Sequence, residues 1–145
     1  MQKHLDRIGA PKFDDKDQEF AKALQKEVGV EQTGLSTEVV PFGPNHGGTA
    51  SSDLGEVSAA KPLAELNVVT RPIGTAAHTW GQTACAIHPL GLKGMEVGTK
   101  VLAASAVDFL QNPKLVGDAK AEFAKATKGK PYQSPLAADA RPAVY

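Results

Sequence analysis

Apolar residues recur at helical spacing in the segment "PKFDDKDQEFAKALQKEVGV", residues 11–30. Its apolar stripe consists of Phe13, Phe20, Leu24 and Val28. Asp14 or Asp15 can cap the start of this helix, where the helix dipole also favours acidic side chains. Gly29 stands where a left-handed residue commonly ends a helix. The pattern therefore predicts an amphipathic helix with one face in the core.

The middle of the chain holds two segments with the composition of strands. Residues 37–42, "TEVVPF", predict a short strand that ends at Pro41 or Pro44. Residues 66–73, "LNVVTRPI", are rich in β-branched side chains and predict a buried strand. Between them lies a long loop of glycine, proline and serine, a kind of loop that is often functional. Within this stretch, "SSDLGEVSAA" predicts a short helix capped by Ser52 or Asp53.

The second half of the chain predicts a loop followed by two helices. Residues 74–94 are glycine-rich and are expected to be mostly loop, and residues 95–110 form a helix that is apolar on nearly every side. A helix of that kind is expected to be buried, between a sheet and another helix. Asn112 and Pro113 suit the first positions of a second helix, which ends at Gly129. Residues 130–145 are expected to form an extended tail.

The alternation of helices and strands predicts the α/β class, as part of a mostly parallel sheet flanked by helices. At 145 residues the chain has the length of one domain. Two strands are too few for a stable sheet. We therefore expect one partial domain of catalytic type, spanning residues 1–145, whose sheet lacks neighbours.

The composition of the chain argues against several classes of partner and cellular location. The chain has 16 basic and 16 acidic residues, so no excess positive charge favours nucleic acid or an anionic membrane as a partner. No stretch is long and apolar enough to cross a bilayer, and the N-terminus lacks the apolar core of a secretory signal. Cys85 is the single cysteine, which excludes an intrachain disulfide and fits a reducing compartment. These features predict a cytoplasmic protein.

The sequence holds no complete catalytic or metal-binding motif. His-Glu-x-x-His, paired Cys-x-x-Cys and Gly-x-Ser-x-Gly are all absent. Cys85 could act as a nucleophile with His78 or His88, but an inert buried thiol is the better interpretation, since nothing marks it as activated. Asp53 and Glu56 could form an acidic pair. Their spacing of three residues favours a capping box instead.

The histidines are the remaining candidates for chemistry. His78 lies in a glycine-rich loop after a predicted strand, where side chains of α/β proteins often reach a site. A lone histidine is more often structural, so the spacing alone leaves both interpretations open. His46 and His88 are weaker candidates, and His4 is expected to lie in a frayed terminus.

Four motifs nevertheless resemble a known family in order and spacing. They are "SSDLGEVS", "GTAAHTW", "GLKGMEVGTKVLAASAVDFL" and "GKPYQSPL". Together they resemble the C-terminal part of the p-aminobenzoyl-glutamate hydrolase type of zinc-dependent amidohydrolases and peptidases. This family also includes aminoacylases and auxin-conjugate hydrolases. The resemblance runs over nearly the whole chain and includes the helix of residues 12–29.

The resemblance implies a site and a reaction. The family's catalytic domain is an α/β sandwich with divalent metals, usually two, that activate a water, and a Glu acts as general base in cleaving an amide. His78 matches the family's last metal ligand. Ser52, Asp53, Gly55 and Glu56 match a loop beside the site, which implies a supporting role for substrate or ligands. The implied substrates are acyl-amino acids or aminobenzoyl-glutamate.

The chain departs from the family because the other metal ligands and the general-base Glu are missing from it. Zinc takes three or four protein ligands, so we expect no stably bound metal and no hydrolysis by this chain alone. The implied partner is a complementary N-terminal half, or a second copy of the chain. The alternative function is a stand-alone interaction module that kept the fold and lost catalysis.

Overall fold

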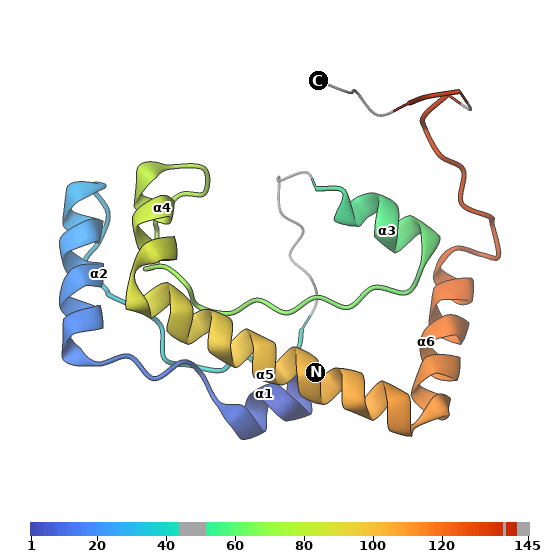
Figure 1. Ribbon diagram of the computed structural model, residues 1–145, viewed down its shortest axis with the longest axis horizontal. Coiled ribbons are helices and arrows are strands. Elements are labelled where there is room, and N and C mark those ends of the chain that lie inside the picture. Colours follow the sequence, from blue (N-terminus) through green and yellow to red (C-terminus); the bar gives the residue numbers. More distant parts are fainter. Residues whose placement is uncertain (44–51, 138, 142–145) are drawn as a thin grey trace. The chain divides into compact units, whose positions relative to one another are not determined.

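The computed structural model describes residues 1–43, 52–137 and 139–141, and these residues form six helices and no strand (Figure 1). The predicted α/β class is therefore wrong for the part of the chain that is described. The helices are α1 (Gln2–Ile8), α2 (Asp15–Glu27), α3 (Leu54–Ala60), α4 (Trp80–Ile87), α5 (Pro89–Gln111) and α6 (Pro113–Ala126). The chain divides into unit 1, Met1–His46 with Glu65–Gln111, and unit 2, Gly47–Ala64 with Asn112–Tyr145.

The two predicted strands lack the pairing that would make them strands. Residues 37–42 and 66–73 are neither helical nor part of a sheet. A strand is defined by the ladder of hydrogen bonds to a neighbour. At the junction of these two segments the structure has one such bond, in which the Ile73 amide donates to the Gly34 carbonyl over 3.4 Å. The β-branched composition predicted the extended backbone but could not provide the neighbouring strand.

Helix α2 confirms the first predicted element. The Asp14 side chain accepts from the Asp17 amide at 3.0 Å, and the Asp17 side chain accepts from the Asp14 amide at 2.9 Å, which completes a capping box. Gly29, with φ 73°, follows the end of the helix in the left-handed conformation. Of the predicted stripe, Leu24 lies in the core of unit 1, and Phe13, Phe20 and Val28 are partly buried against that core.

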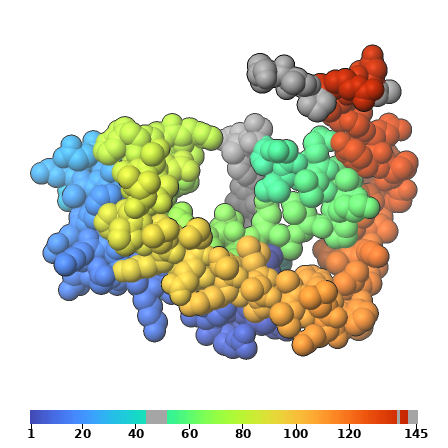
Figure 2. Space-filling model, viewed as in Figure 1, coloured from blue at the N-terminus to red at the C-terminus, as the bar shows by residue number. Residues whose placement is uncertain are grey.

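Helix α4 was not predicted, and α5 begins earlier than the sequence indicated. The predicted loop of residues 74–94 contains α4 and the first turns of α5. Cys85 of α4 and Leu90 of α5 are almost fully buried and pack with α2 in one core cluster. Figure 2 shows the atoms of α2 and α4 side by side on one face of unit 1. Burial of small and apolar side chains therefore stabilises α4, although its glycine and threonine have low helix propensity.

Helix α5 buries one face rather than its whole circumference. The buried face carries Val97, Val101 and Ser105, whereas Leu102 and Phe109 are exposed. The prediction of a helix buried on nearly all sides is therefore wrong. The missing sheet is the physical reason, because no described element covers the second apolar face.

Unit 2 has helices but little core. Asn112 caps α6 by accepting from the Lys114 amide at 3.2 Å, with Pro113 at the first helical position, as predicted. Neither α3 nor α6 contains a buried residue. The described tail residues 130–137 and 139–141 carry no helix or strand. None of the helices described for either unit is long and apolar enough to cross a membrane.

Candidate functional site

The turn that holds His78 is built by local hydrogen bonds and tight packing. Gly74 takes a positive φ of 81°, and the Thr79 hydroxyl donates to the Ala76 carbonyl over 2.9 Å. The side chain of Gln82, in the first turns of α4, accepts from the His78 amide at 2.7 Å. A Cβ added at Gly81 would contact Thr75 at 3.3 Å and Val28 at 3.4 Å, so the start of α4 lies close against the turn and the end of α2.

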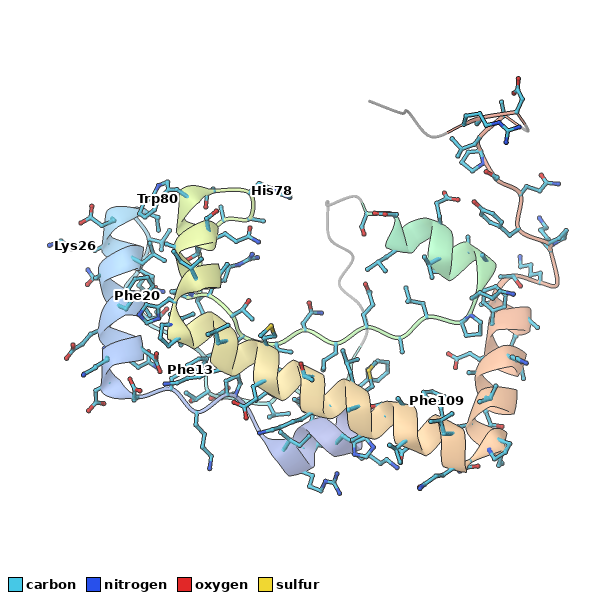
Figure 3. The ribbon with its side chains drawn as sticks, viewed as in Figure 1. Phe13, Phe20, Lys26, His78, Trp80 and Phe109 are labelled. Carbon is cyan, nitrogen blue, oxygen red and sulfur yellow. The ribbon has the colours of Figure 1, made fainter. Side chains whose placement is uncertain are left out.

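His78 combines an exposed ring with an unusual backbone. Its φ is 58°, in the left-handed region that non-glycine residues rarely occupy. Such a conformation costs about 1–2 kcal/mol. Figure 3 shows His78 at the outer end of the turn before α4, and its side chain is exposed. A strained residue with an exposed imidazole is a physical reason to consider a functional role.

One buried polar atom beside this turn lacks a partner. The Thr75 side chain is 5% exposed, and its Oγ1 has no hydrogen-bond partner in the structure as described. A buried unsatisfied hydroxyl costs about 1–3 kcal/mol. Thr75 was not predicted as a site residue, and no sequence pattern distinguishes it from the other threonines of the segment.

The described residues do not fit a metal site by themselves. Within residues 1–43, 52–137 and 139–141, no group of three or more His, Cys, Asp or Glu side chains could hold a metal ion. Zinc takes at least three protein ligands. His78 can therefore contribute at most one ligand to a site that other groups complete.

The second set of predicted site residues lies in unit 2. Ser52, Asp53 and Glu56 are all exposed. The Ser52 hydroxyl accepts from the Leu54 amide at 3.2 Å, while Asp53 occupies the cap position of α3 without a side-chain hydrogen bond. The preferred capping box of Asp53 and Glu56 is therefore not formed. His78 belongs to unit 1, so a site shared by these residues stays a prediction.

Glu56 has a partner that the sequence did not reveal. The Tyr132 hydroxyl donates to the Glu56 carboxylate. This hydrogen bond raises the pKa of the Tyr132 phenol above its ordinary value of 10.0, because removing the proton would place two negative charges together. The contact connects the tail of unit 2 to α3.

The other candidates for chemistry have structural roles where the structure describes them. Cys85 is 1% exposed, and burial raises the pKa of its thiol, which fits the predicted inert cysteine. The His88 ring stacks on Phe20 with ring centroids 3.9 Å apart, and its Nδ1 accepts from the Leu90 amide. His4 is buried in α1 rather than frayed. His46 lies outside the described residues.

Comparison with known proteins finds a distant relative. Over 112 residues, 77% of this chain, the sequence is 29% identical to a p-aminobenzoyl-glutamate hydrolase subunit of Escherichia coli strain K12. The chain spans about a quarter of that protein, since the match covers 23% of its length. No family model matches the chain, and no solved structure matches it. The chain is thus distantly related to part of a larger hydrolase subunit.

Proposed function

We propose that this chain is the C-terminal part of a metal-dependent amidohydrolase. The substrates would be amides of the acyl-amino-acid or aminobenzoyl-glutamate type. The chain would form one partial catalytic domain, completed by a complementary N-terminal polypeptide. Its single cysteine is free and buried, which suits a cytoplasmic location.

The observation that carries this proposal is the distant relation to an aminobenzoyl-glutamate hydrolase subunit over 77% of the chain. The turn of residues 74–82 supports it. There the backbone is strained at His78, and the imidazole is exposed and able to bind a group brought by another polypeptide. In the proposal His78 is one metal ligand, and Ser52, Asp53 and Glu56 hold substrate or neighbouring ligands.

In this proposal the catalytic groups are divided between two polypeptides, so this chain is inactive alone. A divalent metal would polarise the amide and activate a water, and a general-base carboxylate would take the proton. The complementary polypeptide would bring that carboxylate and the remaining ligands.

Zinc binding measured by calorimetry tests the role of His78. We expect no tight binding to the chain alone. We expect tight binding once the chain is co-expressed with the part of the Escherichia coli relative that it does not match. In that complex, His78→Ala should lower zinc affinity by at least tenfold, as expected for loss of one ligand.

A matched pair of variants separates the contribution of the His78 imidazole to zinc affinity from that of its strained backbone. His78→Asn keeps a residue that tolerates the left-handed region, and His78→Gly removes the strain. Both should lose zinc affinity as His78→Ala does. Tight one-to-one zinc binding to the chain alone, unchanged in all three variants, would contradict the proposal.

The alternative function is an interaction module without catalysis. The exposed apolar positions Leu92, Met95, Leu102 and Phe109 favour it, because they recur along one side of α5. A module of this kind would associate with itself or a partner through α5 without zinc. Sedimentation velocity tests this alternative, because the chain should then form a dimer without zinc and Leu102→Glu should dissociate it, whereas a chain that stays monomeric would contradict it.

A further inference from the structure

The C-terminal tail of unit 2 leaves helix α6 through a tight, hydrogen-bonded turn. Lys128 and Gly129 take positive φ values of 54° and 68°, and the Gly129 amide donates to the Ala124 carbonyl over 3.0 Å. A left-handed residue at this place commonly ends a helix. The Lys130 amide then donates to the Thr127 carbonyl over 3.0 Å. The turn therefore sets the direction in which the tail begins.

The tail beyond this turn is stiffened by proline but has no apolar anchor. Residues 130–137 form neither helix nor strand, and all of them are exposed. Pro131 and Pro135 fix two of the φ angles, so the segment loses less conformational entropy on docking than a glycine-rich one would. Since none of these residues is buried, any docking of the tail depends on its polar contacts.

One side-chain hydrogen bond joins this tail to helix α3. The Tyr132 hydroxyl donates to Oε2 of Glu56. Among the residues that the structure describes, no other hydrogen bond and no ion pair connects residues 130–137 with α3. Tyr132 is 42% exposed, whereas Leu136 of the same tail is 71% exposed. Tyr132 is therefore the residue through which the tail rests on α3.

This contact occupies one oxygen of a carboxylate that is otherwise unpaired in the described part of the chain. An ionised carboxylate binds only cations and hydrogen-bond donors. The Tyr132 phenol is such a donor, and the hydrogen bond raises its pKa above 10.0, so it keeps its proton at neutral pH. A ligand that needs both oxygens of Glu56 cannot bind while the phenol holds Oε2.

We propose that residues 130–137 form a strap that closes on Glu56 and is released when a cation or another hydrogen-bond donor takes that carboxylate. The inference rests on the proposed function for the role of Glu56, and it concerns the regulation of that site. An exposed charged contact contributes little to stability, so the docked and free states of the strap lie close in free energy. A ligand that binds Glu56 only in the free state therefore shifts the population toward release.

Carboxyl labelling of the chain alone measures access to Glu56. A water-soluble carbodiimide with glycine ethyl ester converts accessible carboxylates into amides, and mass spectrometry gives the labelling rate of each residue. Tyr132→Phe removes the hydroxyl and keeps the ring, so the rate at Glu56 should rise about threefold, as expected for loss of one exposed contact. Asp53 is the internal reference, because it is exposed and its side chain does not cap α3. Its rate should stay unchanged.

A neighbouring residue of the tail provides the matched control variant. Gln133 is exposed, and its side chain forms no hydrogen bond with the described residues. Gln133→Ala should therefore change the labelling of neither Glu56 nor Asp53.

The same contact can be tested from the side of the tail by NMR. Glu56→Gln keeps an acceptor but removes its charge, so the backbone order of residues 130–137 should fall in Glu56→Gln as in Tyr132→Phe. The order of α6 should stay the same in both variants. In Glu56→Gln the pKa of Tyr132 should also move back toward 10.0.

The outcomes separate the strap from the proposed function. Equal labelling of Glu56 in the parent chain and in Tyr132→Phe overturns the strap. An equal rise at Asp53, or an equal rise in Gln133→Ala, overturns it as well, because either result would mean a general loosening of unit 2. The expected labelling without hydrolysis by the co-expressed complex supports the strap and contradicts the proposed function. Hydrolysis with unchanged labelling supports the proposed function and overturns the strap.

Discussion

Gly94 is the residue at which the packing of unit 1 is least tolerant. An added Cβ would overlap the Val69 carbonyl oxygen and approach Thr70 at 2.8 Å, and backbone cannot move aside as a flexible side chain does. We expect Gly94→Ala to lower the free energy of unfolding by about 1–3 kcal/mol, despite the ~1 kcal/mol that alanine gains over glycine within a helix. Urea denaturation followed by circular dichroism measures this change.

An exposed position of the same helix provides the control for that substitution. Thr99 is exposed in α5, and Thr99→Ala should stabilise the chain by up to about 0.7 kcal/mol through helix propensity alone. If Gly94→Ala stabilised the chain as Thr99→Ala does, the close approach of residues 68–70 to α5 would be wrong.

Lys93 makes the stability of unit 1 depend on pH at both extremes. It forms ion pairs with Asp14, at 2.8 Å, and with the buried Asp17. The hydrogen bond from Lys93 lowers the pKa of Asp14 below 3.8, so the stabilisation by ionised Asp14 is present above that value and lost as pH falls through the lowered pKa. Hydrogen bonds to Asp14 and Asp17 raise the pKa of Lys93 above 10.5, so its contribution is lost as pH rises through the raised pKa.

Lys93→Met should therefore lower the urea midpoint at pH 7. The difference from the parent chain should shrink below pH 3.8 and above pH 10.5, where one partner loses its charge. Lys22→Met is the control, because Lys22 is exposed and forms no ion pair with the described residues. A difference between parent and Lys93→Met that stayed constant from pH 3 to pH 7 would show that packing of the lysine stem, not its charge, stabilises the fold.

At the scale of elements, the sequence predicted those helices whose signals are local. Helix α2 has an apolar stripe and a capping box, and α6 has Asn112 followed by proline. The signals for α4 are not local, because its small residues become helical by packing Cys85 and Gly81 against α2 and the preceding turn. The prediction of strands was wrong because strand composition is a local signal, whereas a strand forms only beside a neighbour. Residues 66–73 have strand composition, but a sheet requires a neighbour that is absent from the described residues.

The candidate site was predictable only in part. The family resemblance made His78 the candidate ligand, which stays a prediction, whereas its left-handed backbone and its hydrogen bond to Gln82 could not be predicted because they depend on where α4 begins. Tyr132 was missed as the partner of Glu56 because the two residues are 76 positions apart in the sequence. Contacts over such separations leave no periodic pattern in a single sequence.

Helix α1 gives a prediction at the level of one element. A helix of seven residues is not stable alone in water, so α1 depends on its contact with α5. Buried His4 provides that contact, since its Nε2 lies 2.6 Å from the Asp108 carboxylate. Arg7 can only donate to Nδ1, at 3.4 Å, which leaves Nε2 as the donor to Asp108. His4→Ala should therefore abolish the hydrogen-exchange protection of α1 and leave that of α2 intact.

Lys3 offers a matched control for His4. It also pairs with Asp108, at 2.8 Å, but its side chain is largely exposed, and exposed pairs contribute little. Lys3→Ala should leave α1 protected. Equal loss of protection in both variants would mean that the charge of Asp108, rather than the buried imidazole, holds α1.

At the scale of the whole molecule, burial is distributed unequally between the units. The buried apolar residues that the structure describes all belong to unit 1: Ala21, Leu24, Leu35, Cys85, Leu90, Val97 and Val101. Helices α3 and α6 of unit 2 bury none. Since burial of apolar surface provides most of the stability of helices in proteins, the two units should not unfold together.

We therefore expect α6 to open at far lower free energy than α2 and the buried half of α5. Hydrogen exchange at pH 7 should show α6 with protection close to that of an isolated helical peptide, and α2 with protection approaching global stability. Gly117→Ala tests the assignment, because nothing lies within 4 Å of the added Cβ and alanine favours the helix by about 1 kcal/mol. It should raise protection in α6 roughly fivefold and leave α2 unchanged. Equal protection of α2 and α6 in the parent chain would instead mean that unit 2 acquires a core that its described residues lack, and that the chain unfolds as one cooperative body.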